Sequence, residues 1–222
     1  MIITIIGVIV LIFSAAVHEF SHGYAAWLLG DPTAKNEGRL TLNPMAHIDP
    51  VGSILMPILG LFGGFMFAWA KPVPYNPYNL RDQKYGDLKV ALAGPLSNLL
   101  IAITAGIIAR LIPLAKEAKF ALIVANKNDV LNLTHGSILS AAYVLLSIII
   151  MYNLVLFVFN LIPIPPLDGS KIIHTILPGT WKYKWAEMEG KFMILLLALM
   201  MFGFFSFIQY PIMILWQLIL GF

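Results

Sequence analysis

The sequence predicts an all-α polytopic membrane protein with about five to six membrane-embedded helices, a re-entrant segment and short membrane-associated β-strands. Its 222 residues are 59% apolar and only 11% charged, a composition too apolar for a soluble domain. The apolar residues gather in runs long enough to cross a bilayer, separated by polar segments rich in proline. We expect one integral membrane domain over residues 1–222, with a core of about 2–175 and C-terminal helices at about 181–222.

The first apolar segment, from about Ile2 to Leu29, is expected to be a retained spanning helix. Residues 1–17 carry no charged side chain, whereas a secretory signal would begin with basic residues and end at a small-residue cleavage site. Gly30, followed by an Asp-Pro pair, is a typical stop signal for a helix. Beyond it, the alternation of polar and apolar residues in Gly38–Leu42 indicates a short strand.

Residues 51–70 form a second apolar segment whose interior is interrupted. Its composition suits a re-entrant segment better than an unbroken spanning helix, because it contains Pro57, Gly60, Gly63 and Gly64. The segment leads into a proline-rich surface loop at 71–87. At the junction, Phe67–Val73 is a second stretch that could pair as a strand with an extended partner.

Three further apolar stretches follow, at about 88–112, 136–161 and 192–222. The mixed segment 113–135 between the first two contains several lysines, which is typical of an amphipathic stretch at the membrane surface. Residues 181–191 are polar and aromatic, as expected at a membrane interface. The last stretch is longer than one crossing needs and contains a Gln-Tyr-Pro sequence, so one or two crossings are both compatible with it.

The first segment contains an H-E-x-x-H sequence formed by His18, Glu19 and His22. In a helix, His18 and His22 project from one face one turn apart, so both imidazoles can reach the same zinc ion. Glu19 is rotated by about 100° from His18. It is therefore better placed to exchange a proton with a water molecule at the metal than to bind the metal.

This pattern is unlikely to arise by chance. With five His and five Glu in 222 residues, random placement gives roughly 0.003 expected matches. Polar residues that pack against a neighbouring helix are the alternative, but ionisable groups in an apolar span are costly and indicate a functional site by default. Because the chain has no cysteine, any metal must be bound by histidine and carboxylate side chains.

A catalytic zinc site usually has a third protein ligand and one open position. Asp168 is a prominent candidate because it follows the 136–161 span directly, in a segment that three prolines prevent from being helical. An Asp-Gly pair is also the usual mark of an ordinary turn, and this interpretation stays open. The other candidates are the remaining carboxylates and three histidines: His47, for which a structural role in a loop is the safer interpretation, His135 and His174.

Membrane topology separates the two interpretations of Asp168. If residues 51–70 crossed the membrane fully, Asp168 and the histidine pair would face opposite sides and could not share a metal ion. If 51–70 is re-entrant, both face the same side, and ten Lys and Arg residues lie on that side against four on the other. A full crossing would divide them eight to six. By the positive-inside rule, the re-entrant arrangement predicts a multi-pass protein of the cell membrane with its active site toward the cytoplasm.

Three motifs resemble those of the site-2 protease family of intramembrane zinc metalloproteases. They are H-E-F-S-H in the first span, A-G-P-L-S-N in the 88–112 span and N-L-I-P-I-P-P-L-D-G after the 136–161 span. The intervening N-P-M-A-H-I-D-P and W-A-K-P-V-P-Y-N-P look like the small prokaryotic branch that lacks a PDZ domain. The resemblance covers residues 10–175 in the family's order.

The resemblance implies roles for six residues. His18, His22 and Asp168 would bind one zinc ion per chain, and Glu19 would be the catalytic base. Asn160 would contact the substrate backbone or the developing oxyanion, and Asn98 would do similar work, although the position of Asn98 within its span by itself favours a role in helix packing. The implied reaction is hydrolysis of peptide bonds in transmembrane segments of membrane protein substrates, as in regulated intramembrane proteolysis.

Two other functions are compatible with a buried metal site. A zinc transporter would need a second intramembrane cluster of acidic or histidine residues, and the sequence shows none. An inactive scaffold would not need Glu19, because metal binding alone does not require that residue. The expected partners are a membrane-embedded protein substrate and the lipid bilayer. No basic cluster with interleaved aromatic residues points to nucleic acid, and no feature indicates an oligomeric state.

Overall fold

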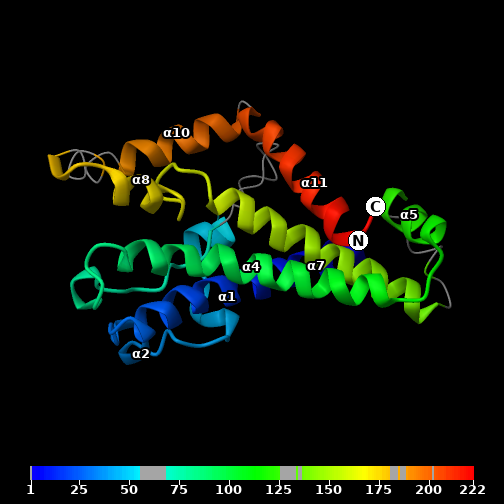
Figure 1. The fold of residues 1–222 in the computed structure, drawn as a ribbon, viewed down its shortest axis with the longest axis horizontal. Helices are drawn as coiled ribbons and strands as arrows, with labels where there is room; N and C mark the ends of the chain where they lie inside the picture. Colours follow the sequence, from blue (N-terminus) through cyan, green and yellow to red (C-terminus); the bar gives the residue numbers. More distant parts are fainter. Residues whose placement is uncertain are drawn as a thin grey trace.

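The computed structural model describes residues 2–55, 69–125, 134, 137–180, 185, 189–201 and 203–222. Three helices among them are long and apolar enough to cross a membrane: α1 (Ile2–Leu28), α4 (Gly86–Leu111) and α7 (Ile138–Asn160). Figure 1 shows these three helices side by side as the body of the molecule. The helical membrane class expected from composition is thus confirmed, whereas the expected count of five to six embedded helices stays a prediction.

Shorter helices connect and flank these three. They are α2 (Thr33–Asn36), η1 (Pro44–His47), the π-helix η2 (Pro50–Leu55), η3 (Pro77–Asn79), α5 (Lys116–Val124), α8 (Ser170–Ile176), α10 (Glu189–Met201), η4 (Phe204–Ile208) and α11 (Gln209–Leu220).

The first helix ends where the sequence predicts. Gly30 has a φ of +111°, which L side chains rarely adopt, so the chain leaves the helix at this glycine. The chain returns to the C-terminal end of α1 at Arg81, whose backbone N–H donates to Leu29 O at 2.8 Å. Residues 30–85 therefore start and finish at one end of the bundle, and α4 runs antiparallel to α1.

Helix α4 lies between α1 and α7 and contacts both. Its face toward the core carries the small residues Ala102, Ala105 and Ala109, which let the neighbouring helices approach closely. Tyr143 and Leu154 of α7 belong to the same buried cluster and have no exposed surface. Since α7 runs antiparallel to α4, the C-terminal end of α7 lies at the same end of the bundle as the C-terminal end of α1 (Figure 1).

The C-terminal part of the chain leads back along the bundle. Gly203, with a φ of +66°, separates α10 from η4, and α11 then packs against α4 and α7. The Arg110 side chain donates from Nε to Ile219 O at 2.8 Å, so the end of α11 meets the end of α4. In Figure 1 the end of α11 accordingly lies near the N-terminal end of α1, away from α8.

The expected short strands are absent from the described residues. Gly38–Leu42 is not a strand, because a strand requires a paired backbone and this segment has no such partner within the described chain. A side chain makes the connection instead: Arg39 Nη2 donates to Lys71 O at 2.9 Å. Residues 56–68 lie outside the described residues, so the re-entrant character of 51–70 and the first part of Phe67–Val73 stay predictions.

Candidate metal centre

The two histidines of the H-E-x-x-H sequence meet on the inner face of α1. Their Nε2 atoms are 3.0 Å apart, and their rings are nearly perpendicular with centroids separated by 4.6 Å. Both residues are buried, with His18 6% and His22 8% exposed. The helical spacing therefore does what the sequence predicts, since it directs two ring nitrogens at a single point inside the bundle.

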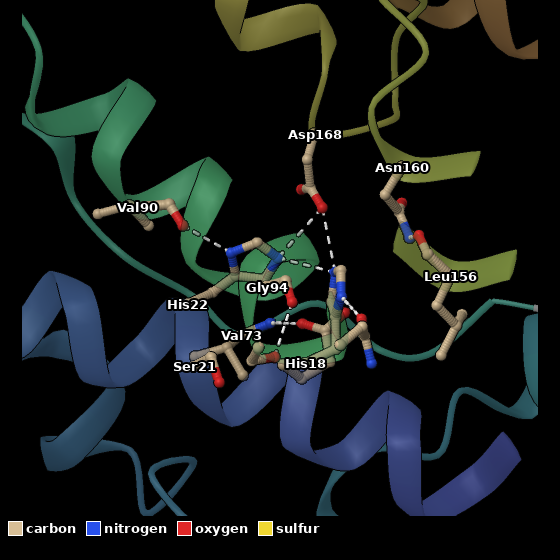
Figure 2. A network of polar contacts seen from close by, with 12 residues as sticks. His18, Ser21, His22, Val73, Val90, Gly94, Leu156, Asn160 and Asp168 are labelled. Atoms are coloured by element: carbon tan, nitrogen blue, oxygen red, sulfur yellow. Dashed lines mark hydrogen bonds and ion pairs between the residues drawn. The ribbon is translucent and has the colours of Figure 1, made fainter. Parts of the chain in front are cut away.

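Asp168 reaches this point from the other end of the sequence. Its Oδ2 lies 3.0 Å from His18 Nε2 and 3.3 Å from His22 Nε2 (Figure 2). The loop that carries Asp168 is tied to the end of α7, because the Gly169 backbone N–H donates to Asn160 O at 2.6 Å. Figure 2 shows the carboxylate pointing down from this loop onto the two imidazoles.

The outer nitrogen of each imidazole bonds to α4. His22 Nδ1 lies 2.8 Å from Val90 O, and His18 Nδ1 lies 2.6 Å from Asn98 Oδ1. A backbone carbonyl can only accept a hydrogen bond, so His22 Nδ1 carries a proton, and in the neutral imidazole the lone pair is then on Nε2. Partners of this kind hold metal-binding imidazoles in the tautomer that a metal requires.

Helix α4 approaches the histidines closely at Gly94. A Cβ atom at this position would lie 2.6 Å from His18 Nε2 and nearer still to His22 Nε2. The absence of a side chain at residue 94 therefore leaves room for the Nε2 atoms of both histidines. The sequence by itself does not indicate that Gly94 faces the histidines.

The donor set fits a zinc ion. The potential ligand atoms of His18, His22 and Asp168 all lie within 4.8 Å of one another, and they form the single such group found in the described part of the chain. Two imidazole nitrogens and one carboxylate oxygen are a ligand set of catalytic zinc sites, in which the fourth position stays open.

Glu19 is not part of the His18–His22–Asp168 group of potential ligands. Its Oε2 accepts a hydrogen bond from the Val73 backbone N–H at 2.9 Å. Glu19 is half-buried, and this bond fixes one carboxylate oxygen while the other keeps its lone pairs. The segment before Val73 is itself anchored, because Lys71 N donates to His47 O at 2.8 Å.

The loop that carries Val73 is held by a buried carboxylate. Asp31 has no exposed surface and accepts hydrogen bonds from Asn76 N at 2.7 Å, Asn79 Nδ2 at 2.8 Å and Thr33 Oγ1 at 2.6 Å. Burial alone would raise the pKa of Asp31, but these hydrogen bonds outweigh it and hold the pKa below its usual value. The sequence showed Asp31 only as part of a helix stop signal.

The two asparagines expected to contact substrate differ in position. Asn160 is half-buried at the end of α7, and its Nδ2 donates to Leu156 O of its own helix at 3.0 Å (Figure 2). Asn98 has no exposed surface and bonds to His18. Asn98 is therefore buried against His18, while Asn160 lies beside the loop that carries Asp168.

The other histidine candidates lie elsewhere. His47 is buried in η1, and its Nε2 bonds to Thr41 O at 2.8 Å, which agrees with a structural role in a loop. His174 of α8 lies 3.9 Å from Asp87, a carboxylate that also pairs with Lys171 at 3.6 Å. His135 lies outside the described residues.

Comparison with known proteins places this site in a family context. The family model described as peptidase family M50 matches residues 6–204. The Bacillus subtilis protein named "Putative zinc metalloprotease YwhC" is 36% identical over 93% of this chain and 84% of its own length. "Putative zinc metalloprotease Rip2" of Mycolicibacterium smegmatis is 34% identical over 44% of this chain and 39% of its own length. The protein of the same name from Mycobacterium tuberculosis is 29% identical over 70% of this chain and 51% of its own length. No solved structure matches the chain significantly.

Proposed function

Because the chain belongs to peptidase family M50, the site-2 protease family, and is a zinc metalloprotease with membrane helices, we propose that it hydrolyses peptide bonds within the transmembrane segments of membrane protein substrates. The observation that carries the proposal is the position of His18, His22 and Asp168 inside a bundle of apolar helices. His22 precedes the end of α1 by six residues, or about 9 Å of helix. A peptide bond cleaved at this site must therefore reach well below the membrane surface.

We propose that His18, His22 and Asp168 hold one zinc ion. When bound, zinc supplies a Lewis acid that polarises the scissile carbonyl and lowers the pKa of a water molecule. Glu19 acts as the general base: it takes a proton from the attacking water and returns it to the leaving amine as the C–N bond breaks. The hydrogen bond from Val73 N holds one Glu19 oxygen in place and leaves the lone pairs of the other oxygen available to accept the proton.

The two asparagines are assigned different tasks. Asn98, together with the Val90 carbonyl, orients the imidazoles and keeps their inner nitrogens available to the metal. Asn160 contacts the substrate backbone or the oxyanion, a role worth about 3 kcal/mol in comparable sites. For this role its amide exchanges the bond to Leu156 O for a bond to substrate, which a rotation of its side chain allows.

Substrate is proposed to bind in an extended form. A helical substrate hides its carbonyls in its own hydrogen bonds, so it must unwind before cleavage. The segment that ends at Val73 reaches Glu19 directly, and Arg39 connects it to the Gly38–Leu42 segment. Unpaired backbone beside the site can add an unwound substrate as a strand, although these segments form no strand by themselves.

The proposed topology is a multi-pass protein of the cell membrane with the metal site toward the cytoplasm. The C-terminal ends of α1 and α7 lie at one end of the bundle, as the re-entrant arrangement of 51–70 requires. The Lys and Arg residues then divide ten to four in favour of that side. The chain from α10 to α11 leads to the opposite end, which favours a single crossing by residues 192–222.

The rival proposal, a zinc transporter, has less support. Transport requires a second site along a path, and His18, His22 and Asp168 form the sole potential metal group within the described residues. A scaffold without activity would not need a carboxylate at Glu19 that is held by the backbone of a distant loop.

Activity and metal binding can be separated experimentally with purified protein. Wild type, Glu19→Gln and Asp168→Ala are each assayed for zinc content and for cleavage of a reporter with a single transmembrane segment. We expect about one zinc per chain in wild type and Glu19→Gln, cleavage in wild type alone, and weakened zinc binding in Asp168→Ala. Turnover by Glu19→Gln at the wild-type rate would refute the assignment of the base.

A further inference from the structure

Asn153 lies in the middle of α7, has no exposed surface, and bonds to both of the other long helices. Its Oδ1 accepts from Asn98 Nδ2 of α4 at 2.9 Å, and its Nδ2 donates to Ser14 Oγ of α1 at 2.9 Å. The same Nδ2 donates to Ile149 O of its own helix at 2.8 Å. Asn98 in turn contacts His18, so these hydrogen bonds connect α7 to a metal-binding histidine.

Which group donates in each of these linked hydrogen bonds follows from the acceptor at one end of the series. Ile149 O is a carbonyl and can only accept, so the Asn153 atom that faces it must be the amino group. The Asn153 carbonyl then faces Asn98, which must present its own amino group. The Asn98 carbonyl is left for His18 Nδ1, which must therefore donate.

We propose that Asn153 is a positioning residue of the metal centre, which orients the Asn98 amide so that His18 keeps its Nε2 lone pair free for zinc. A reversed Asn98 amide would present its amino group to His18 Nδ1. That nitrogen would then have to accept, the proton would move to Nε2, and His18 could not bind a metal through the atom that faces Asp168.

Asn153 is the stronger of two restraints on the Asn98 amide. The other is Ser14 O, which the same Asn98 amino group reaches at 3.3 Å, compared with 2.9 Å to Asn153. A bond of 3.3 Å lies beyond the usual range for N–H···O, so it alone holds the orientation weakly. Residue 153 also lies on the helix that leads into Asp168, so α7 influences both the His18 and the Asp168 positions.

Simple helix packing is the alternative role, because buried amides commonly bond across membrane helices. The two roles predict different routes by which Asn153 affects zinc binding. A packing residue affects zinc binding only by loosening the bundle, whereas a positioning residue acts through Asn98 and loses its effect when the Asn98 amide is absent.

The test is a competitive zinc titration of the full chain in detergent, alongside thermal unfolding of the zinc-free protein. Asn153→Leu is expected to weaken zinc binding about ten-fold, at the lower end of the effect of outer-shell partners. In an Asn98→Ala background, the same substitution should change zinc affinity by less than about two-fold. Ser147→Ala is the matched control, because among the described residues this buried α7 hydroxyl bonds only within its own helix, to Tyr143 O at 2.9 Å. Its zinc affinity should equal that of wild type.

Three results would overturn the inference. They are unchanged zinc affinity in Asn153→Leu, an equal loss in both backgrounds, or failure of both Asn153→Leu and the smaller Asn153→Ala to fold, which would assign Asn153 to packing. The inference rests on zinc binding by the histidine pair and not on cleavage. Absence of zinc from wild type would refute the proposed function itself. If wild type binds zinc and Asn153→Leu binds it with equal affinity, only the proposed role of Asn153 is refuted.

Discussion

Gly94→Ala should strongly weaken metal binding, although alanine is the better helix former. Replacing glycine by alanine inside a helix ordinarily stabilises it by about 1 kcal/mol. The added methyl group would lie 2.6 Å from His18 Nε2, where ordinary contacts begin at 3.4 Å. The histidine must therefore move by about 0.8 Å, and His22, whose Nε2 lies nearer still, by more.

A displacement of this size exceeds what a metal site tolerates. Metal–ligand distances hold to within about 0.2 Å, and a shift of about 1 Å in a catalytic group can reduce the rate about 100-fold. We therefore expect Gly94→Ala to lose most of its zinc after dialysis and to cleave at least about 100-fold more slowly. Its thermal stability without zinc should not rise, because overpacking of about 1–3 kcal/mol offsets the gain in helix propensity.

The assay compares zinc per chain, cleavage rate and unfolding temperature in wild type and two variants. Gly190→Ala is the control, since a Cβ there has no atom within 4 Å and the substitution tests helix propensity alone. It should keep both zinc and activity. Full zinc occupancy together with near-normal cleavage in Gly94→Ala would show that α4 does not press on the histidines as the structure indicates.

Three further predictions concern other parts of the molecule. Asp31→Asn should destabilise the protein by about 2 kcal/mol, because it weakens charge-assisted hydrogen bonds at a buried site, and chemical unfolding would measure this. Because the folded pKa of Asp31 is lowered, its stabilisation is complete above the ordinary value of 3.8 and is lost as the pH falls below it, so wild type and Asp31→Asn should converge in acid. His47→Ala should lower the unfolding temperature without changing zinc content, since its ring bonds to Thr41 O outside the metal site; loss of zinc would contradict its structural role. Removal of zinc by a chelator should stop cleavage and destabilise the fold, and added zinc should restore both, as followed by unfolding temperature.

The distinction between local and long-range information explains what the sequence by itself determined. The membrane class follows from composition, and the shared direction of His18 and His22 follows from the helical repeat, which is a local property of five consecutive residues. The turn at Gly30 was equally visible, because only glycine tolerates such a conformation without strain. Gly38–Leu42 shows the limit of local patterns: alternation suggested a strand, but a strand needs a partner that the sequence alone does not supply.

The tertiary structure decided which distant groups surround the histidines. Asp168 was one of several candidate third ligands, and only the packing of α7 parallel to α1 brings it within 3.0 Å of a histidine 150 residues away. The Val90 carbonyl could not have been chosen from sequence, because every residue has one. Asn98 was expected at the substrate but is buried against His18. Burial and amide direction depend on three helices at once, so they exist only in the assembled fold.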